Sequence, residues 1–256
     1  MTSHGEASGA LEAAYSRMSL DDLLRLEAQK DSLGHSARQA LAIELRKRRP
    51  DIVALAVAEA ILATAIASAE KSEQEFCAKV AEARKFKDAD FQGIVTEFVY
   101  LFLHLCDRDA FVAITDPQER GSFVDSIFNH VFRFGTTLLM TEGHPMPAFT
   151  RREEKNEPGI VIVKNGMDDL NERQKEYAPL PLFAAQDASL NGTVFWEFGK
   201  HIATICSHYE GGPSLKFKAD LLACAAYRDL IPVFTKMHEP PRSTGGFFHR
   251  LFNRGR

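Results

Sequence analysis

Apolar residues cover almost the whole circumference of one segment, residues 91–113. The segment is long enough for about six helical turns, contains no proline, and is apolar over roughly two-thirds of a helical wheel. A helix that is apolar on nearly all sides is typical of the centre of a bundle. One narrow polar stripe interrupts it at spacings of three, four and seven residues, and is formed by Glu97, Tyr100, His104, Arg108 and Phe111.

Three further segments have the pattern of helices, at 51–85, at 190–209 and from 214 onward. The first is rich in alanine at its start and in charged residues towards its end. The last contains Pro232, which we expect to kink the helix or to end it early, because proline removes a backbone hydrogen bond and clashes with the preceding turn.

The segment 116–140 has the strongest helix start signal in the chain. Asp116 is a capping residue, Pro117 occupies the first helical position and Glu119 the third. The short connection to the helix at 91–113 predicts that the two helices are antiparallel neighbours.

The N-terminal part of the sequence predicts a short helical hairpin after a disordered start. Residues 1–10 are small and polar, and we expect them to be disordered. Ser19 and Ser36 each open a pattern typical of a capping box, with a turn at Gly34 between the two helices. Pro50 is expected to end the second helix or to start the next one.

The sequence of residues 15–48 is YSRMSLDDLLRLEAQKDSLGHSARQALAIELRKR. It resembles a helical hairpin at the N-termini of uncharacterised bacterial all-helical proteins. The resemblance covers these residues only, and it implies no activity, cofactor or partner.

Residues 141–188 differ in character, because glycine and proline interrupt them repeatedly. Residues 160–163 are the only run typical of a strand, and Asn165-Gly166 follows as a turn signal. A short helix is expected at 168–177, and the charged run 151–155 is interpreted as a solvated loop. Insertions of this length between helices are uncommon and are often functional or mobile.

We therefore expect an all-α fold, a helical bundle of about five long helices with an N-terminal αα-hairpin and an irregular insertion at 141–188. The predicted domains are a tail and hairpin at 1–49, the bundle at 50–238, and a basic amphipathic tail at 239–256.

Composition is ordinary for a globular protein of 256 residues, with 45% hydrophobic and 26% charged residues. A net charge of −4 gives no reason to expect nucleic acid as a partner. The 19 phenylalanines, against 5 tyrosines and 1 tryptophan, predict a core filled with rings rather than an aromatic binding platform.

The cysteines are far apart and form no C-x-x-C pair, so free buried thiols in a reducing compartment are expected. The N-terminus has no basic region followed by an apolar run, which predicts no secretory signal and a cytoplasmic location. The four cysteines are Cys77, Cys106, Cys206 and Cys224.

The segment 52–69 is apolar enough to be tested as a membrane span. Glu59 near its middle opposes insertion by about 2.5–3.5 kcal/mol, and alanine contributes little to partitioning. A close-packed helix of a soluble bundle is the favoured interpretation, with insertion as the alternative.

The stripe of Glu97, Tyr100, His104 and Arg108 is the first candidate site. As a functional site it would bind a metal ion or a small ligand, or supply a general base, together with another helix. The structural alternative is a buried network in which Glu97 and Arg108 pair across helices while His104 bonds a backbone carbonyl. The Glu-x-x-His pattern of di-iron bundles does not occur in the sequence.

A second candidate, Glu197 with His201 and His208, has spacings that resemble those of metal ligands. Because polar residues surround these positions on the helical wheel, the solvent-facing side of an amphipathic helix is the favoured interpretation. The Gly211–Ser214 turn follows a helix rather than a strand, which makes it a poor phosphate-binding loop.

The C-terminal tail predicts contact with a protein partner or, alternatively, weak contact with a membrane surface. It places apolar side chains on one helical side, with basic residues around them and no acid. The residues concerned are Phe247, Phe248, Arg250, Leu251, Phe252 and Arg254.

The sequence contains no catalytic signature, so the favoured function is that of a non-enzymatic cytoplasmic helical protein acting through protein–protein interaction or as a homo-oligomer. No cofactor is expected. The alternatives are a metal- or small-ligand-binding protein using Glu97 and His104, and a peripheral membrane protein using the tail.

Overall fold

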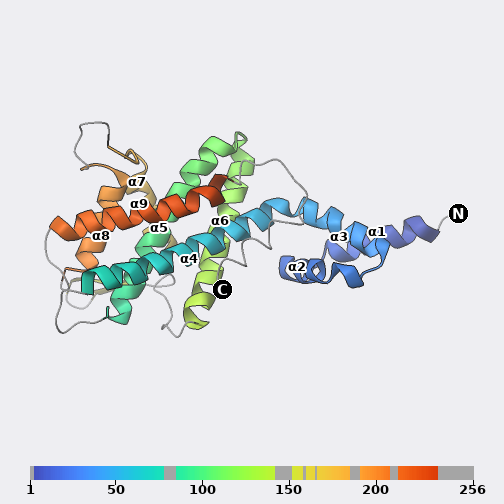
Figure 1. Ribbon diagram of the computed structural model, residues 1–256, viewed down its shortest axis with the longest axis horizontal. Helices are drawn as coiled ribbons and strands as arrows, with labels where there is room; N and C mark the ends of the chain where they lie inside the picture. The colour runs from blue at the N-terminus through green and yellow to red at the C-terminus, as the bar shows by residue number, and fades with distance from the viewer. Residues whose placement is uncertain are drawn as a thin grey trace. The chain divides into compact units, whose positions relative to one another are not determined.

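The computed structural model describes residues 3–77, 85–141, 152–157, 160–164, 166–184, 191–207 and 213–235. Over these residues the protein is a helical bundle with one short β-hairpin, which confirms the all-α prediction (Figure 1). The chain divides into two compact units, Met1–Ala56 and Val57–Arg256, and the division falls within one long helix, α4 (Arg49–Cys77).

Besides the start of α4, the described residues of the first unit form three helices and a single 3-10 turn. Both α1 (Ser3–Tyr15) and α2 (Leu20–Ala28) contact α3 (His35–Lys47), and the turn η1 (Lys30–Ser32) precedes α3. The expected disorder of residues 1–10 is wrong from Ser3 onward. Alanine has the highest helix propensity of all residues, and the helix that it supports ends at a buried tyrosine, Tyr15.

Helix capping in this unit follows the sequence signal at one of two positions. Ser19 accepts a hydrogen bond from the Asp22 backbone N–H at 3.2 Å, as predicted. The second capping box is wrong, because Gly34 is the N-cap of α3 and provides no side-chain hydrogen bond. Pro50 lies in the first turn of α4, where a missing N–H breaks no helical hydrogen bond.

The second unit is organised around α5 (Asp88–Ala113), as the apolar pattern predicted. α5 contacts α6 (Pro117–Thr141), α7 (Gly166–Tyr177), α8 (Val194–Ile205) and α9 (Pro213–Thr235). α8 and α9 pack side by side (Figure 1). Every α5 residue from Phe91 to Cys106 except Gly93 is buried.

The two proline-based predictions had different outcomes. Asp116 Oδ1 accepts hydrogen bonds from the backbone N–H groups of Gln118 and Glu119, both at 2.8 Å, which confirms the predicted start of α6. Pro232 does not end α9, which continues to Thr235. Pro232 lies three residues from the end and is exposed, so its ring displaces no packed neighbour.

The insertion contains a β-hairpin and α7. Strand β2 (Ile160–Lys164) contains the run that the sequence identified, and it pairs antiparallel with β1 (Arg152–Glu157). The interpretation of residues 151–155 as a loop is wrong for the part of this run that forms β1. The charged sequence of β1 has no strand periodicity, and its backbone is extended because it pairs with β2. Gly166 begins α7 and is not part of a hairpin turn. The predicted short helix at 168–177 is confirmed.

Candidate functional site: a buried polar network between α5, α7 and α8

The polar stripe of α5 lies inside the protein. Glu97 and His104 are each 3% exposed and Tyr100 is buried as well, whereas Phe111 at the end of the helix is exposed. Buried polar groups have to find hydrogen-bond partners, since leaving them unpaired is costly. The neighbours of this stripe therefore determine what it can do.

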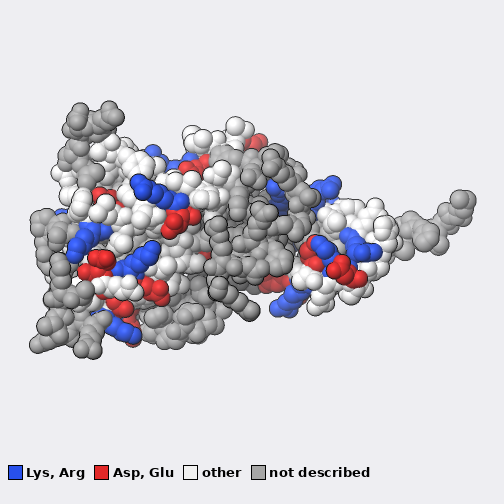
Figure 2. Space-filling view, viewed as in Figure 1, with Lys and Arg blue, Asp and Glu red and all other residues white. Residues whose placement is uncertain are grey.

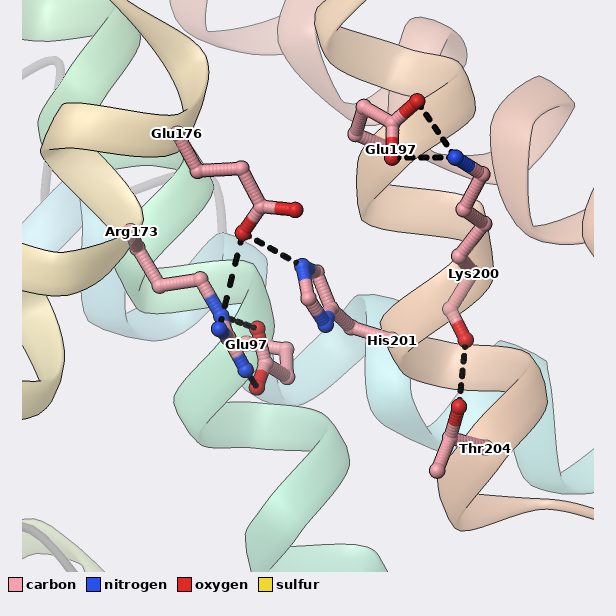
Figure 3. Close-up of polar contacts among 7 residues, drawn as sticks. All are labelled: Glu97, Arg173, Glu176, Glu197, Lys200, His201 and Thr204. Atoms are coloured by element: carbon pink, nitrogen blue, oxygen red, sulfur yellow. Dashed lines mark hydrogen bonds and ion pairs between the residues drawn. The ribbon is translucent and has the colours of Figure 1, made fainter.

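Arg173 of α7 forms a bidentate ion pair with Glu97. Its Nε donates to Glu97 Oε2 at 3.0 Å and its Nη2 donates to Oε1 at 2.8 Å (Figure 3). Burial lowers the pKa of the guanidinium, but the hydrogen bonds and negative charge of Glu97 outweigh this effect and raise the pKa overall. Both carboxylate oxygens of Glu97 are thus held by a permanently charged group.

The prediction that Glu97 and Arg108 pair across helices is confirmed for Glu97, whose partner Arg173 lies on α7. Arg108 donates to the backbone carbonyl of Leu180, just beyond α7, at 2.7 Å.

His104 contacts two residues of α7. Its Nδ1 lies 2.6 Å from Gln174 Oε1, and its ring meets the ring of Tyr177 edge-on at 5.4 Å between centroids. The expected partner was a backbone carbonyl, so this detail was wrong. Gln174 Oε1 accepts from Nδ1–H in this arrangement, which leaves the lone pair of the imidazole on Nε2.

The network continues from α7 to α8. Glu176 Oε2 lies 2.9 Å from His201 Nε2 and 3.5 Å from an Arg173 nitrogen, so Glu176 joins the buried pair to α8 (Figure 3). The interpretation of His201 as simply solvent-facing is wrong, because its side chain is largely covered and faces α7. Glu197 pairs with Lys200 on its own helix at 2.6 Å, and His208 lies outside the described residues.

Sequence reasoning found the α5 side of this network and missed the α7 side. The signal was present as the spacing i, i+3, i+4, i+7 of Leu170, Arg173, Gln174 and Tyr177. That spacing places all four on one side of a helix. Leu170 and Tyr177 are fully buried and anchor this side on the bundle, and the two polar residues between them face α5.

Among the described residues, no group of three or more His, Cys, Asp or Glu side chains is placed to hold a metal ion. The thiols of Cys77, Cys106 and Cys206 are buried, and all four cysteines are free, as expected. Burial raises the pKa of Cys206 to about 12, with smaller contributions from nearby acidic groups, so this thiol stays protonated at neutral pH.

The remaining sequence candidates lie at the surface or outside the described residues. Helix α4 is long and apolar enough to cross a membrane, and 61% of its apolar window is buried inside the protein, which core helices of soluble proteins also show. Figure 2 shows positive and negative side chains intermixed on the visible face of the second unit. Residues 211 and 212 are outside the described part of the chain, as are Phe247, Phe248, Arg250, Leu251, Phe252 and Arg254.

No protein-family model matches this sequence, and searches of curated proteins and of solved structures found no match. The basis for a function is therefore the chemistry of the protein's own residues.

The environment of His104 favours its neutral form. Burial lowers the pKa of its imidazole below the usual 6.5, and the charge of Arg108 adds to this effect. The hydrogen bond to Gln174 and the charge of Asp107 act in the opposite direction and are outweighed. Arg173 and Glu176 of α7 are the charged side chains that pack against this part of α5 in the network, and Glu176 also contacts the imidazole of His201 on α8.

We expect the protein to lose stability below about pH 6.5 because of His104. There the unfolded chain binds a proton at this imidazole, and the folded chain does not until the pH reaches the lowered pKa. As the pH falls from about 6.5 towards the lowered pKa, the free energy of unfolding should decrease by at most about 1.4 kcal/mol per pH unit. Above about pH 6.5, His104 makes no contribution to the pH dependence of stability. Urea denaturation at a series of pH values measures the slope. In His104→Gln the slope should be shallower, and equal slopes in both proteins would contradict the assignment.

Proposed function

We propose that this protein is non-enzymatic and acts by binding a short amphipathic helix through one side of α9. The observation that supports it is the exposure of three large apolar side chains, Phe217 at 48%, Leu221 at 54% and Ile231 at 42%. Their spacings place them within about 80° of one another around the helix. We call this surface the α9 face.

The α9 face is distinct from the side by which α9 packs into the bundle. Leu215, Leu230 and Phe234 lie about 100–160° from the centre of the α9 face around the helix, and each is 1% exposed. α9 is therefore apolar on both sides, and only one side is covered by the described residues of this chain. Single exposed apolar residues are common, but an aligned set is typical of a surface that binds a partner.

A shallow groove of about 230 Å³ lies between α4 and α9, and Ala225, which lines it, is one helical turn from Leu221 of the α9 face. Its floor is formed by small side chains, which allow the backbone of a bound helix to approach closely. Lys71 and Asp229 supply charge at its edge. The floor residues are Ala63 and Ala67 of α4 and Ala225 and Ala226 of α9.

The favoured occupant is a helix with adjacent apolar residues and basic flanks. Asp229 lines the groove and can pair with a basic flank of the partner, and Lys71 lines it as well. The chain itself contains such a sequence in residues 247–256, FFHRLFNRGR. The twelve residues from Thr235 to Phe247 can span about 40 Å, and the α9 face is only about 21 Å long. A second copy of the chain, or the same copy, can therefore supply the occupant.

A labelled peptide of residues 244–256 tests this proposal by fluorescence anisotropy with the full-length protein. We expect Leu221→Asp to weaken binding at least about tenfold, since it places a charge in an apolar contact. The matched control is Val112→Asp, which changes an exposed apolar residue of α5 instead of α9 and should leave the affinity unchanged.

A chain that ends at residue 244 should bind the peptide more tightly than the full-length protein, because it carries no competing tail. Light scattering then shows whether the tail associates within one copy or between copies. Absence of peptide binding to both proteins would contradict the proposal. Binding to anionic vesicles that Leu221→Asp leaves unchanged, without peptide binding, would instead support the membrane alternative.

A further inference from the structure

Three polar atoms at the contact between α5 and α7 have no hydrogen-bond partner within the described part of the protein. They are His104 Nε2, Gln174 Nε2 and the hydroxyl of Tyr177, each with less than 1 Å² of exposed surface. The residues are in direct contact with one another, through the 2.6 Å bond between His104 and Gln174 and the edge-on contact of the His104 and Tyr177 rings. Tyr177 is fully buried, at 0% exposure, and His104 is 3% exposed.

Unpaired buried polar atoms are rare in native proteins, with a few per hundred residues, and each weakens the folded state. Three such atoms on touching residues indicate that something polar pairs with them. The carboxylates near Tyr177 already have other partners, since Glu97 accepts from Arg173, Glu176 from His201, and Glu197 from Lys200.

We propose that His104, Gln174 and Tyr177 form an internal binding site for a small, uncharged hydroxylic molecule, of which water is the simplest. The lone pair of His104 Nε2 accepts a hydrogen bond, the amide of Gln174 donates, and the hydroxyl of Tyr177 can do either. A hydroxyl group complements this set, because it donates one hydrogen bond and accepts others. Buried water molecules in proteins usually form about three such bonds.

The site accepts a neutral molecule in preference to an ion. All three groups are neutral, and an ion in this buried position would need an opposite charge that none of them provides. The positive charge of Arg173 on α7 is already paired with Glu97.

The position of the site gives the bound molecule a role in the fold. His104 lies on α5, whereas Gln174 and Tyr177 lie on α7, so a molecule bonded to His104 and to either residue of α7 joins the two helices. α7 has only two fully buried apolar residues, Leu170 and Tyr177, among those described, and polar contacts provide much of its attachment. Loss of the bound molecule should therefore loosen α7 before the rest of the bundle.

Tyr177→Phe tests the proposal through the sign of its effect on Tm. If a bound molecule pairs with the hydroxyl, its removal lowers Tm by roughly 2–6 °C. If the hydroxyl is unpaired, its removal leaves Tm unchanged or raises it, which would overturn the proposal. The control is Tyr227→Phe. The hydroxyl of Tyr227 lies 3.3 Å from Asp109 Oδ2, so the change in Tm of this variant shows the effect of removing a buried tyrosine hydroxyl that has a known partner.

A crystal structure of the full-length protein provides an independent test that does not depend on stability. We expect electron density within hydrogen-bonding distance of at least two of the three atoms. Density for a single atom identifies water, and larger density, with a matching mass released from the denatured protein, identifies an organic hydroxyl compound. No density at the site, or pairing of the three atoms with protein groups alone, would overturn the proposal.

Discussion

Glu97→Gln is expected to lower the free energy of unfolding by about 3 kcal/mol. The substitution keeps the shape of the side chain and removes its charge, so that Arg173 remains largely buried without its bidentate partner. The estimate is at the low end for a broken buried pair, because Glu176 lies 3.5 Å from Arg173 and compensates part of the charge.

Urea denaturation followed by circular dichroism measures this change, and Glu197→Gln is the matched control. Glu197 also forms an ion pair, with Lys200 at 2.6 Å, but the lysine is 45% exposed and the two residues are neighbours on one helix (Figure 3). Such pairs contribute about 0.5 kcal/mol or less. Equal losses in the two variants would contradict the assignment of a buried, structurally important pair.

The double variant Glu97→Gln/Arg173→Met separates the ion pair from the cost of an isolated charge. Replacing both members of a buried pair by groups without charge is often close to neutral, whereas removing one member is not. We therefore expect the double variant to recover most of the stability lost in Glu97→Gln. A double variant as unstable as the single one would show that the arginine charge is not the source of the loss.

The sequence predicted the elements whose signals are local. Residues 91–113 are apolar around most of the helical circumference, and this pattern identified the central helix. The capping residue Asp116 and the proline Pro117 identified the start of α6. Both signals act within a few residues of the chain, through side-chain burial and through backbone hydrogen bonds at a helix end. Neither requires knowledge of a distant partner.

The polar network could be predicted only in part, because its two sides are far apart in the chain. Glu97 and His104 are conspicuous among apolar neighbours, whereas Arg173 and Gln174 belong to a short helix of mostly polar sequence. Such a helix has little propensity to bury itself, and its position depends on the ion pair formed across 76 residues. Helix periodicity identified α7 but not which residue of α5 it would contact.

The close approach of α8 and α9 is a second feature that the sequence does not show. Gly199 of α8 faces the backbone of α9, and a Cβ atom at this position would lie 2.8 Å from the carbonyl oxygen of Lys216. Real Cβ atoms do not approach other heavy atoms so closely, and a backbone carbonyl of a packed helix has little freedom to move aside.

Gly199→Ala is therefore expected to destabilise the protein by about 1–3 kcal/mol, as other overpacked interiors are destabilised. Helix propensity alone predicts the opposite sign, since alanine is favoured over glycine within a helix by about 0.5–1 kcal/mol. Thermal denaturation should show a Tm lower by several degrees.

Two other helical glycines make the test specific. Gly121 of α6 has no heavy atom within 4 Å of the position that an added Cβ would occupy, so Gly121→Ala should raise Tm through propensity alone. Gly93 of α5 is the intermediate case, because an added Cβ would contact the side chain of Ile205 at 3.4 Å, which is an ordinary van der Waals distance. The expected order of Tm is Gly121→Ala above Gly93→Ala above Gly199→Ala. Since the same atom is added to a helix each time, this order depends only on what surrounds each glycine, and a Gly199→Ala protein as stable as Gly121→Ala would show that α8 and α9 do not meet at Lys216.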